Sequence, residues 1–247
     1  RTMGSGKYSA LSGAVAREQA LANIAANLAN VTTTGFKRDR TSFAAVLKDA
    51  RQIEAGRGIN HTRIQRIAAD FSQGALQETG RPLDLAIEGE GFFKVRRGGE
   101  VFYTRAGHLQ IDENGLVRTA DGLNLVDATN QPLQLDTTTA RDIVIAESGE
   151  ISVDGEVTDS RIQVVAFTDP KLLVKAGNTL YRAGEGAAER PADTTRVLQG
   201  SLETANVNMM EEMTAMVRTQ RAFEVHHKAI ESYSKLGEKL DELGTLG

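Results

Sequence analysis

The side chains that come closest to a catalytic or metal site are the four histidines, His61, His108, His226 and His227. Glu224 and His227 are three residues apart, the spacing of the Glu-x-x-His pairs that hold di-iron centres in helix bundles. Such a centre needs two of these pairs and further glutamates from other helices. The sequence contains one pair, so it favours a polar helix face over a metal site.

Other signatures of catalysis are missing from the sequence. It has no G-x-S-x-G nucleophile elbow, no phosphate-binding P-loop and no H-E-x-x-H zinc motif. The lack of cysteine excludes disulfides, thiolate metal sites and cysteine nucleophiles. A formal net charge of -4 argues against nucleic-acid binding, which needs a strongly basic surface. We therefore expect a protein that is not an enzyme, with no metal, no cofactor and no nucleic-acid partner.

The elements that must position these side chains begin with two long helices, one at each end of the chain. Apolar residues recur at helical spacings from about Gly6 to Asn30 and again from about Asn208 to Leu243. Gly35 closes a turn cluster after the first helix, and Asn208 is the expected N-cap of the second, with Glu211 as its capping-box partner. The apolar positions are Tyr8, Leu11, Val15, Leu21, Ile24 and Leu28, then Met213, Met216, Val217, Phe223, Ile230, Tyr233, Leu236, Leu240 and Leu243.

The middle of the chain has the pattern of a β domain. Residues 109–112 and 116–118 flank Asn114-Gly115, which predicts a hairpin. Residues 143–145 and 161–167 are further predicted strands, and Asp121-Gly122 and Asp154-Gly155 are predicted turns. A segment with eight Lys or Arg against three acids precedes this region, and a solvated loop is its favoured interpretation over a contact with acidic partners or phospholipid.

These patterns predict an α+β fold with a discontinuous helical domain. Residues 6–35 and 205–243 form a coiled-coil-like helical domain, 36–69 a basic linker and 70–204 a central all-β domain. Each helix must bury its apolar stripe, against the other helix, the β domain or another subunit. The first stripe is diluted with Ala and Asn and buries little area. Two interpretations stay open at this point, one compact domain or helices that pack between subunits.

Three groups of motifs resemble the rod, hook and hook-associated proteins of the bacterial flagellum. They occur in the order of that family and nearly span the chain, with the weakest match from about Asp127 to Gly200. The first group is Asn27-Leu28-Ala29-Asn30 and Thr34-Gly35-Phe36-Lys37; the second is Phe71-Ser72-Gln73-Gly74, Leu83-Asp84-Leu85-Ala86-Ile87, Gly89-Glu90-Gly91-Phe92-Phe93 and Tyr103-Thr104-Arg105-Ala106-Gly107; the third is Ser201-Leu202-Glu203, Asn206-Val207-Asn208, Glu211-Glu212-Met213 and Gln220-Arg221-Ala222-Phe223-Glu224.

This resemblance implies a structural subunit of the basal-body rod. Family members assemble helically in the periplasm with themselves and with other rod and axial proteins, and their terminal helices line the export channel of a shaft that transmits torque. They leave the cytoplasm through the flagellar type III export apparatus, which agrees with the absence of a secretory signal peptide and of a membrane-spanning run from the sequence. The short segment from Phe36 to Phe71 and the opening Tyr8-Ser9-Ala10-Leu11 resemble proximal-rod members, with distal-rod and hook subunits as alternatives. A secreted β-domain adhesin or carbohydrate-binding module is the non-flagellar alternative.

The expected assembly interface follows the matched motifs and the helical stripes. Gly35 is expected to leave the helix with positive φ, and Asn23, Asn27 and Asn30 share a helix face from which they could hydrogen-bond across subunits. Gly35→Val or Phe223→Asp is expected to block incorporation into the basal body without unfolding the β domain. The predicted interface residues are Leu11, Val15, Leu21, Asn23, Ile24, Asn27, Leu28, Asn30, Gly35, Phe36, Asn206, Asn208, Met213, Met216, Gln220, Arg221, Phe223, Ile230, Leu236 and Leu240.

Overall fold

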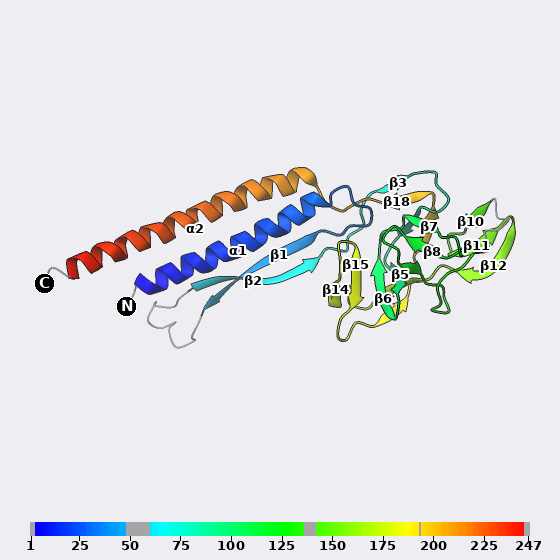
Figure 1. Ribbon diagram of the computed structural model, residues 1–247, viewed down its shortest axis with the longest axis horizontal. Helices are drawn as coiled ribbons and strands as arrows, with labels where there is room; N and C mark the ends of the chain where they lie inside the picture. The colour runs from blue at the N-terminus through cyan, green and yellow to red at the C-terminus, as the bar shows by residue number, and fades with distance from the viewer. Residues whose placement is uncertain (1–2, 48–59, 136–141, 193, 245–247) are drawn as a thin grey trace. The chain divides into compact units, whose positions relative to one another are not determined.

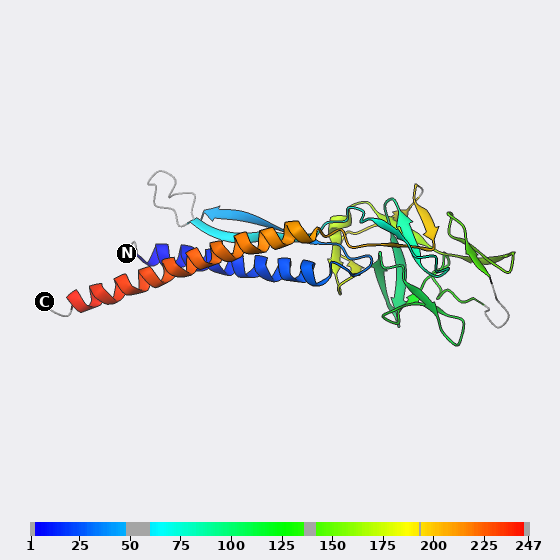
Figure 2. The ribbon, with the colours of Figure 1, turned by 90° about the horizontal axis from the view of Figure 1, so that it is seen from above.

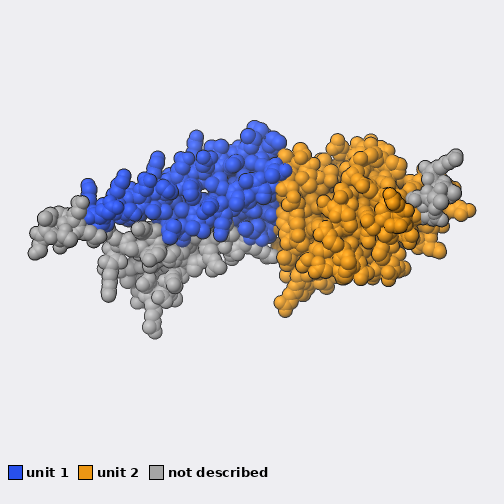
Figure 3. Space-filling view, in the orientation of Figure 1, with its two compact units in different colours: residues 1–29, 39–68, 208–247 blue, residues 30–38, 69–207 orange. Residues whose placement is uncertain are grey.

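The chain folds as two units, each built from separated stretches of sequence, in a computed structural model that describes residues 3–47, 60–135, 142–192 and 194–244. Unit 1 comprises residues 1–29, 39–68 and 208–247, and unit 2 comprises residues 30–38 and 69–207 (Figure 3). Helices form most of unit 1 and strands form unit 2, so the expected α+β class is confirmed.

Unit 1 is built on a pair of helices from the two ends of the chain. The helices α1 (Met3–Ala29) and α2 (Met209–Gly244) pack side by side and run in opposite directions (Figures 1 and 2). The predicted N-cap of α2 is confirmed, because Oδ1 of Asn208 accepts from the backbone N–H groups of Met210 and Glu211 at 3.0 and 3.3 Å. Glu211 and Glu212 lie in the first turn, where the helix dipole favours negative charge.

Residues 36–69, which the sequence predicts to be a basic linker, contain two strands in the structure. Strands β1 (Asp39–Leu47) and β2 (Asn60–Ala69) pair in a two-stranded sheet, and β1 contacts α1 within unit 1. Basic residues dominate this segment and obscure the β-branched residues, such as Val46 and Ile67, that favour strands. The side chains of Lys48, Arg51, Arg57 and Arg63, on which the predicted role of the linker depended, lie outside the described residues.

Unit 2 contains the remaining strands of the described chain. Its largest sheet has nine strands, with the main order β14-β15-β6-β5-β9-β8-β7, while β13 pairs with β5 and β16. The strands are β3 (Leu76–Glu78), β4 (Leu85–Glu88), β5 (Phe92–Arg97), β6 (Glu100–Thr104), β7 (Leu109–Ile111), β8 (Val117–Thr119), β9 (Asn124–Leu125), β10 (Ile143–Ile145), β11 (Glu150–Val153), β12 (Glu156–Arg161), β13 (Val164–Phe167), β14 (Leu173–Lys175), β15 (Leu180–Ala183), β16 (Glu189–Pro191), β17 (Arg196–Gln199) and β18 (Ser201–Glu203), with a 3-10 turn η2 at Pro170–Leu172.

Local turn chemistry explains several of these strands. The predicted hairpin is confirmed by antiparallel β7 and β8, with Gly115 between them at φ 78°. The predicted strand at 161–167 is divided into β12 and β13, because Ile162 bridges Asp127 between the two sheets. Two short pairs, β17 with β4 and β18 with β3, join the end of unit 2 to its beginning.

The core of unit 2 is mainly aliphatic, as the low aromatic content predicts. One buried cluster includes Leu85, Ile87, Phe93, Leu125 and Ile151, and every one of these except Phe93 is aliphatic. A second cluster contains the aromatic contacts, and is formed by Phe92, Tyr103, Val165, Phe167, Leu173 and Tyr181. These two clusters form the packed interior on which the polar side chains of unit 2 are held.

Candidate assembly site

Three charged side chains from distant parts of the sequence meet inside unit 2. Nζ of Lys37 donates to Oε1 of Glu203 at 2.6 Å, and Nη1 of Arg105 donates to Oε2 of the same carboxylate at 3.1 Å. The side chains of Lys37 and Glu203 are 1% and 0% exposed. One carboxylate therefore pairs with two buried cations, so its loss would leave both buried charges without a counter-charge.

Backbone groups complete this ion cluster of Lys37, Arg105 and Glu203. The Lys37 ammonium also donates to the carbonyl of Ser72 at 2.6 Å, and Arg105 donates to that of Gly89 at 2.7 Å. Burial lowers the pKa of both cations, and the attraction of Glu203 opposes that shift. The expectation that Lys37 belongs to a solvated basic linker is therefore wrong, because its partner is far away in the sequence.

The chain segments that lead from α1 and into α2 lie side by side in unit 2. The N–H of Gly35 donates to the carbonyl of Glu203 at 2.7 Å, and the N–H of Arg38 donates to Oδ1 of Asn206 at 2.8 Å. Nδ2 of Asn206 donates to the carbonyl of Asp70 at 2.7 Å, and the Phe36 ring is 1% exposed. Gly35, Phe36 and Asn206 therefore make their observed contacts within the chain, and contact with a second subunit stays a prediction for them.

Gly35 adopts the positive φ that the sequence predicts, at 70°. A Cβ atom at this position would overlap the backbone of Arg105 and Ala106. The expectation that Gly35→Val leaves the β domain folded is therefore not supported, because Gly35 is part of the packing of unit 2.

The three asparagines of the predicted interface bind inside the chain. Asn27 forms a two-way hydrogen bond with the backbone of Asp39, at 3.0 and 3.1 Å, and Asn23 donates to Oγ1 of Thr41 at 2.8 Å. Asn30 accepts from Oγ1 of Thr33 at 3.2 Å. The amides of Asn23 and Asn27 thus hold β1 on α1, which the helical spacing did not reveal, and their contact with another subunit stays a prediction.

The first helix buries mainly small residues, and one of them, Gly13, faces the second helix. Ala10, Gly13, Ala14 and Ala20 of α1 are buried, and a Cβ atom on Gly13 would come within 2.5 Å of the His226 ring. The larger residues Leu11 and Val15 are exposed instead. The helices pair closely while leaving apolar surface uncovered in the described chain.

The first turns of α2 carry the largest group of exposed apolar side chains on this helix. We call it the methionine patch, and it consists of Met209, Met210, Met213, Met216 and Val217. The second half of the same helix exposes charged residues, among them Arg221, Glu224, Lys228, Glu231 and Lys235. Exposed apolar surface of this kind commonly marks a contact with another protein.

The other predicted interface residues on the helices differ in exposure. Leu21, Ile24, Leu28, Phe223 and Ile230 are of intermediate exposure, whereas Gln220 and Leu236 are exposed. The side chain of Leu240 lies outside the described residues. The sequence therefore identifies the correct helices, and the structure separates their inner and outer faces.

A second polar cluster contains the His108 that the sequence singled out. Nδ1 of His108 lies 2.8 Å from Oδ1 of Asp84, and Oδ2 of Asp84 accepts from Nε of Arg81 at 2.8 Å and Oγ1 of Thr79 at 2.7 Å. Burial alone would raise the pKa of Asp84, but the hydrogen bonds from His108, Thr79 and Arg81 outweigh it and lower that pKa.

The lowered pKa of Asp84 predicts a loss of stability in acid. Because the unfolded chain binds this proton more tightly, the stabilisation is present above the unfolded pKa of about 3.9 and is lost as pH falls through the folded value. We expect Asp84→Asn to flatten the decline of unfolding free energy below about pH 4, measured by urea denaturation, while Asp159→Asn on the surface leaves it unchanged. An unaltered decline in Asp84→Asn would contradict this assignment.

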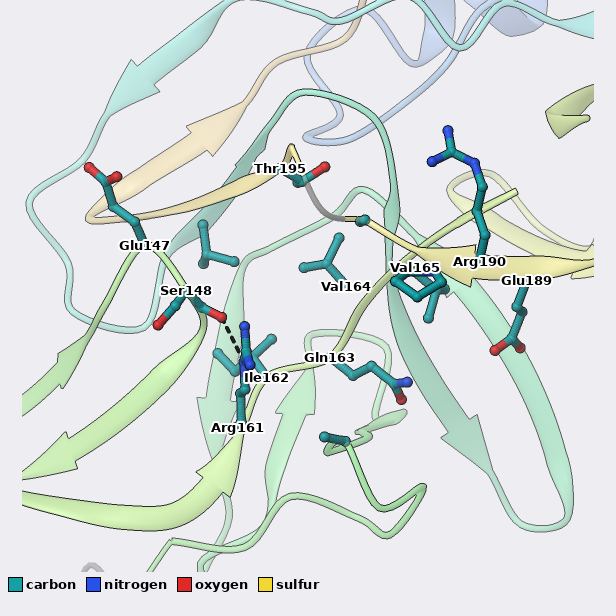
Figure 4. Close-up of a pocket in the computed structure, with 14 residues that line it drawn as sticks. Glu147, Ser148, Arg161, Ile162, Gln163, Val164, Val165, Glu189, Arg190 and Thr195 are labelled. Carbon is teal, nitrogen blue, oxygen red and sulfur yellow. Dashed lines mark hydrogen bonds between the residues drawn. The ribbon is translucent and has the colours of Figure 1, made fainter. Parts of the chain in front are cut away.

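A cavity of about 640 Å³ opens beside β13 and β16 (Figure 4). Arg161 donates to the carbonyl of Ser148 at 2.8 Å across its rim, and Arg190 pairs with Glu90 at 2.6 Å. Among the described residues that line it, none is a histidine, so Ser148 and Thr195 have no imidazole base there. The described lining of the cavity therefore lacks a serine–histidine pair.

The described residues contain neither a cluster of metal-binding side chains nor a membrane-spanning helix. No group of three or more His, Cys, Asp or Glu side chains there is placed to hold a metal ion. No described helix combines the length and apolar character needed to cross a membrane.

Three family models match successive parts of the chain. They are the flagella basal body rod protein at residues 8–37, the flagellar hook protein FlgE/F/G D1 domain at 86–153 and the flagellar basal body rod FlgEFG protein C-terminal at 198–243. The FlgG rod protein of Bacillus subtilis (strain 168) is 33% identical over 96% of this chain and 97% of its own length. The chain belongs to the flagellar basal-body rod protein family. The Caulobacter vibrioides rod protein FlgF is 30% identical over 97% of this chain and 98% of its own length, and the Borreliella burgdorferi FlgG is 31% identical over 91% and 93%.

The three matched rod-family segments each supply one member of the ion cluster. Lys37 ends the first segment, Arg105 lies in the second and Glu203 lies in the third. The sequence motifs contained all three residues, but the sequence did not predict that their side chains contact one another. In this rod protein the motifs therefore include residues that join the start and the end of unit 2.

Proposed function

We propose that this rod subunit is a proximal-rod protein of the FlgF type that assembles helically through the outer surfaces of α1 and α2. The observation that carries the proposal is the sorting of side chains in unit 1. Gly13 faces His226 of α2 and Ala10, Ala14 and Ala20 are buried, while Leu11, Val15 and the methionine patch remain exposed. Apolar side chains in these positions can be buried by neighbouring helices, and methionine adapts to partners of different shape.

The proposal includes the partners and location expected of an axial protein. Other rod proteins and further copies of this chain would cover the exposed helix faces, and the chain would reach the periplasmic rod through the flagellar type III export apparatus. Its role is structural, without catalysis. Support comes from the family, whose relatives are named as rod proteins.

A proximal position is favoured by the short segment between Phe36 and Phe71 and by the opening of the chain. The alternative is a distal-rod protein of the FlgG type. More of the similar relatives carry the name FlgG than the name FlgF. Caulobacter vibrioides contains relatives of both names and can separate the two. We expect the chain to restore swimming in a strain that lacks FlgF and not in one that lacks FlgG.

The same strain tests the role of the helix surfaces. Met213→Asp and Phe223→Asp are expected to abolish swimming and remove the chain from purified basal bodies. A buried methionine or phenylalanine contributes about 1.5–3 kcal/mol, so each carboxylate should weaken association by about tenfold or more. Incorporation is measured by immunoblotting of basal bodies against total cell protein.

Ser232→Asp is the matched control, since it adds the same carboxylate to an exposed polar position of α2. Circular dichroism should show that all three variants retain their strands and helices. Normal incorporation of both Met213→Asp and Phe223→Asp would refute assembly through this helix.

A further inference from the structure

The three-stranded sheet of β10, β11 and β12 exposes two valines on its outer face. Val144 is opposite Ser152 on β11, and Ser152 is opposite Val157 on β12, so the three side chains form one row across the sheet. Val144 is 48% exposed and Val157 is 72% exposed. We call this row the valine face. Exposed apolar side chains of this kind commonly mark a contact with another protein surface.

Acidic side chains surround the valine face. The described part of this sheet and its turns exposes Asp142, Glu147, Glu150, Asp154, Glu156 and Asp159, against one basic residue, Arg161. A partner for this surface should therefore offer an apolar hollow beside hydrogen-bond donors or positive charge.

A groove with this character lies elsewhere on unit 2. Its volume is about 510 Å³, and its apolar lining comes from Pro82, Leu83, Leu109, Ile111 and Ile143. Arg81 lies at the rim with 58% of its side chain exposed, beside His108 at 30%. Nε and Nη2 of Arg81 bind Asp84, whereas Nη1 donates to no residue in the described chain. The groove therefore presents a guanidinium edge next to an apolar floor.

The groove borders the inner face of the β10–β12 sheet through Ile143, whereas the valine face is the outer face of that sheet. Ile143 lines the groove and is opposite Val153 in the inner row, which packs on the core of unit 2. Val144, the next residue, points to the other face because side chains alternate along a strand. The valine face of one molecule therefore cannot fill the groove of the same molecule.

The geometry points to a head-to-tail contact in which Val157 of one copy enters the groove of the next copy. Asp159, two residues after Val157 on the same strand, then lies beside Arg81 and His108 of that next copy, where opposite charges fix the register. Two different surfaces take part, so the contact repeats head to tail, and within the proposed helical assembly it would generate a helical row of β units. This inference rests on the proposed helical assembly and adds a second contact to it, separate from the helices.

Disulfide trapping tests this contact in the full chain, which contains no cysteine of its own. Gln110 is exposed and lines the groove, so Val157→Cys and Gln110→Cys place one thiol on each proposed surface. After mild oxidation of the concentrated double variant, we expect a ladder of covalent dimers, trimers and larger species on a non-reducing gel. Each single variant should remain monomeric, because its thiol would face a surface without a second thiol.

Other outcomes would overturn the contact. Dimers from either single variant would indicate a symmetric contact, and a double variant that stays monomeric would show that the two surfaces do not meet. A Val157→Thr, Gln110→Cys control should give no ladder. Basal-body incorporation of the unaltered chain is measured in parallel: incorporation without a ladder refutes this contact alone, whereas failure to incorporate refutes the proposed function.

Discussion

Replacement of Glu203 by Gln is expected to lower the unfolding free energy of unit 2 by about 3–5 kcal/mol. The carboxylate binds Lys37 through one oxygen and Arg105 through the other. An amide offers one acceptor and turns its NH2 group toward a cation, so one buried charge loses its partner and gains an unfavourable donor. Chemical denaturation followed by far-ultraviolet circular dichroism and by tyrosine fluorescence measures the loss.

Glu100→Gln is the matched control for this experiment. Glu100 pairs with Arg182 at 2.8 Å, but both side chains are more than half exposed. Solvent screens such a pair, so we expect a loss of about 0–1 kcal/mol. Equal losses of unfolding free energy in the two variants would mean that burial does not strengthen the contribution of the ion cluster to stability.

Replacement of Gly35 by Ala is expected to destabilise unit 2 strongly, because two separate costs add at this turn. Its φ of 70° alone costs a residue with a Cβ atom about 1–2 kcal/mol. The new methyl group would also overlap the backbone of Arg105 and Ala106, which cannot rotate away as a side chain could. We expect a total loss at least twice that of the φ contribution, measured by thermal and urea unfolding.

Gly122→Ala separates the two contributions. Gly122 has a similar φ of 77°, but a Cβ atom there has no neighbour within 4 Å. The loss in Gly122→Ala should therefore report the φ contribution alone. If the two variants were equally stable, close packing of Gly35 against residues 105–106 would be refuted.

The helices and the main turns could be predicted from the sequence because their causes are local. Helical spacing of apolar residues located α1 and α2, and the cap at Asn208 depends on a side chain that binds the backbone two and three residues later. Asn114-Gly115 specified the hairpin in the same way. The family motifs identified the class of protein in a different way. Matching residues in the same order are enough to identify a family, even where the structural role of each residue is unknown.

The inner and outer faces of the helices could not be predicted from periodicity. The apolar stripe left open whether its residues pack on the other helix, the β domain or another subunit, and in the described chain Ala10, Ala14 and Ala20 are buried while Leu11 and Val15 are exposed. A stripe shows which residues avoid water, but small residues allow the closest approach of two helices. The remaining large side chains are then available to other partners.

The sequence by itself determined two terminal helices, a β-rich middle and the positive φ of Gly35, since each follows from residues a few positions apart. Tertiary structure alone decided that Lys37 is buried, that Asn27 binds β1 and that the valine face and the groove oppose each other. Glu203 neutralises Lys37 across 166 residues of sequence. Charge compensation depends on distance in space, which no local pattern of residues specifies.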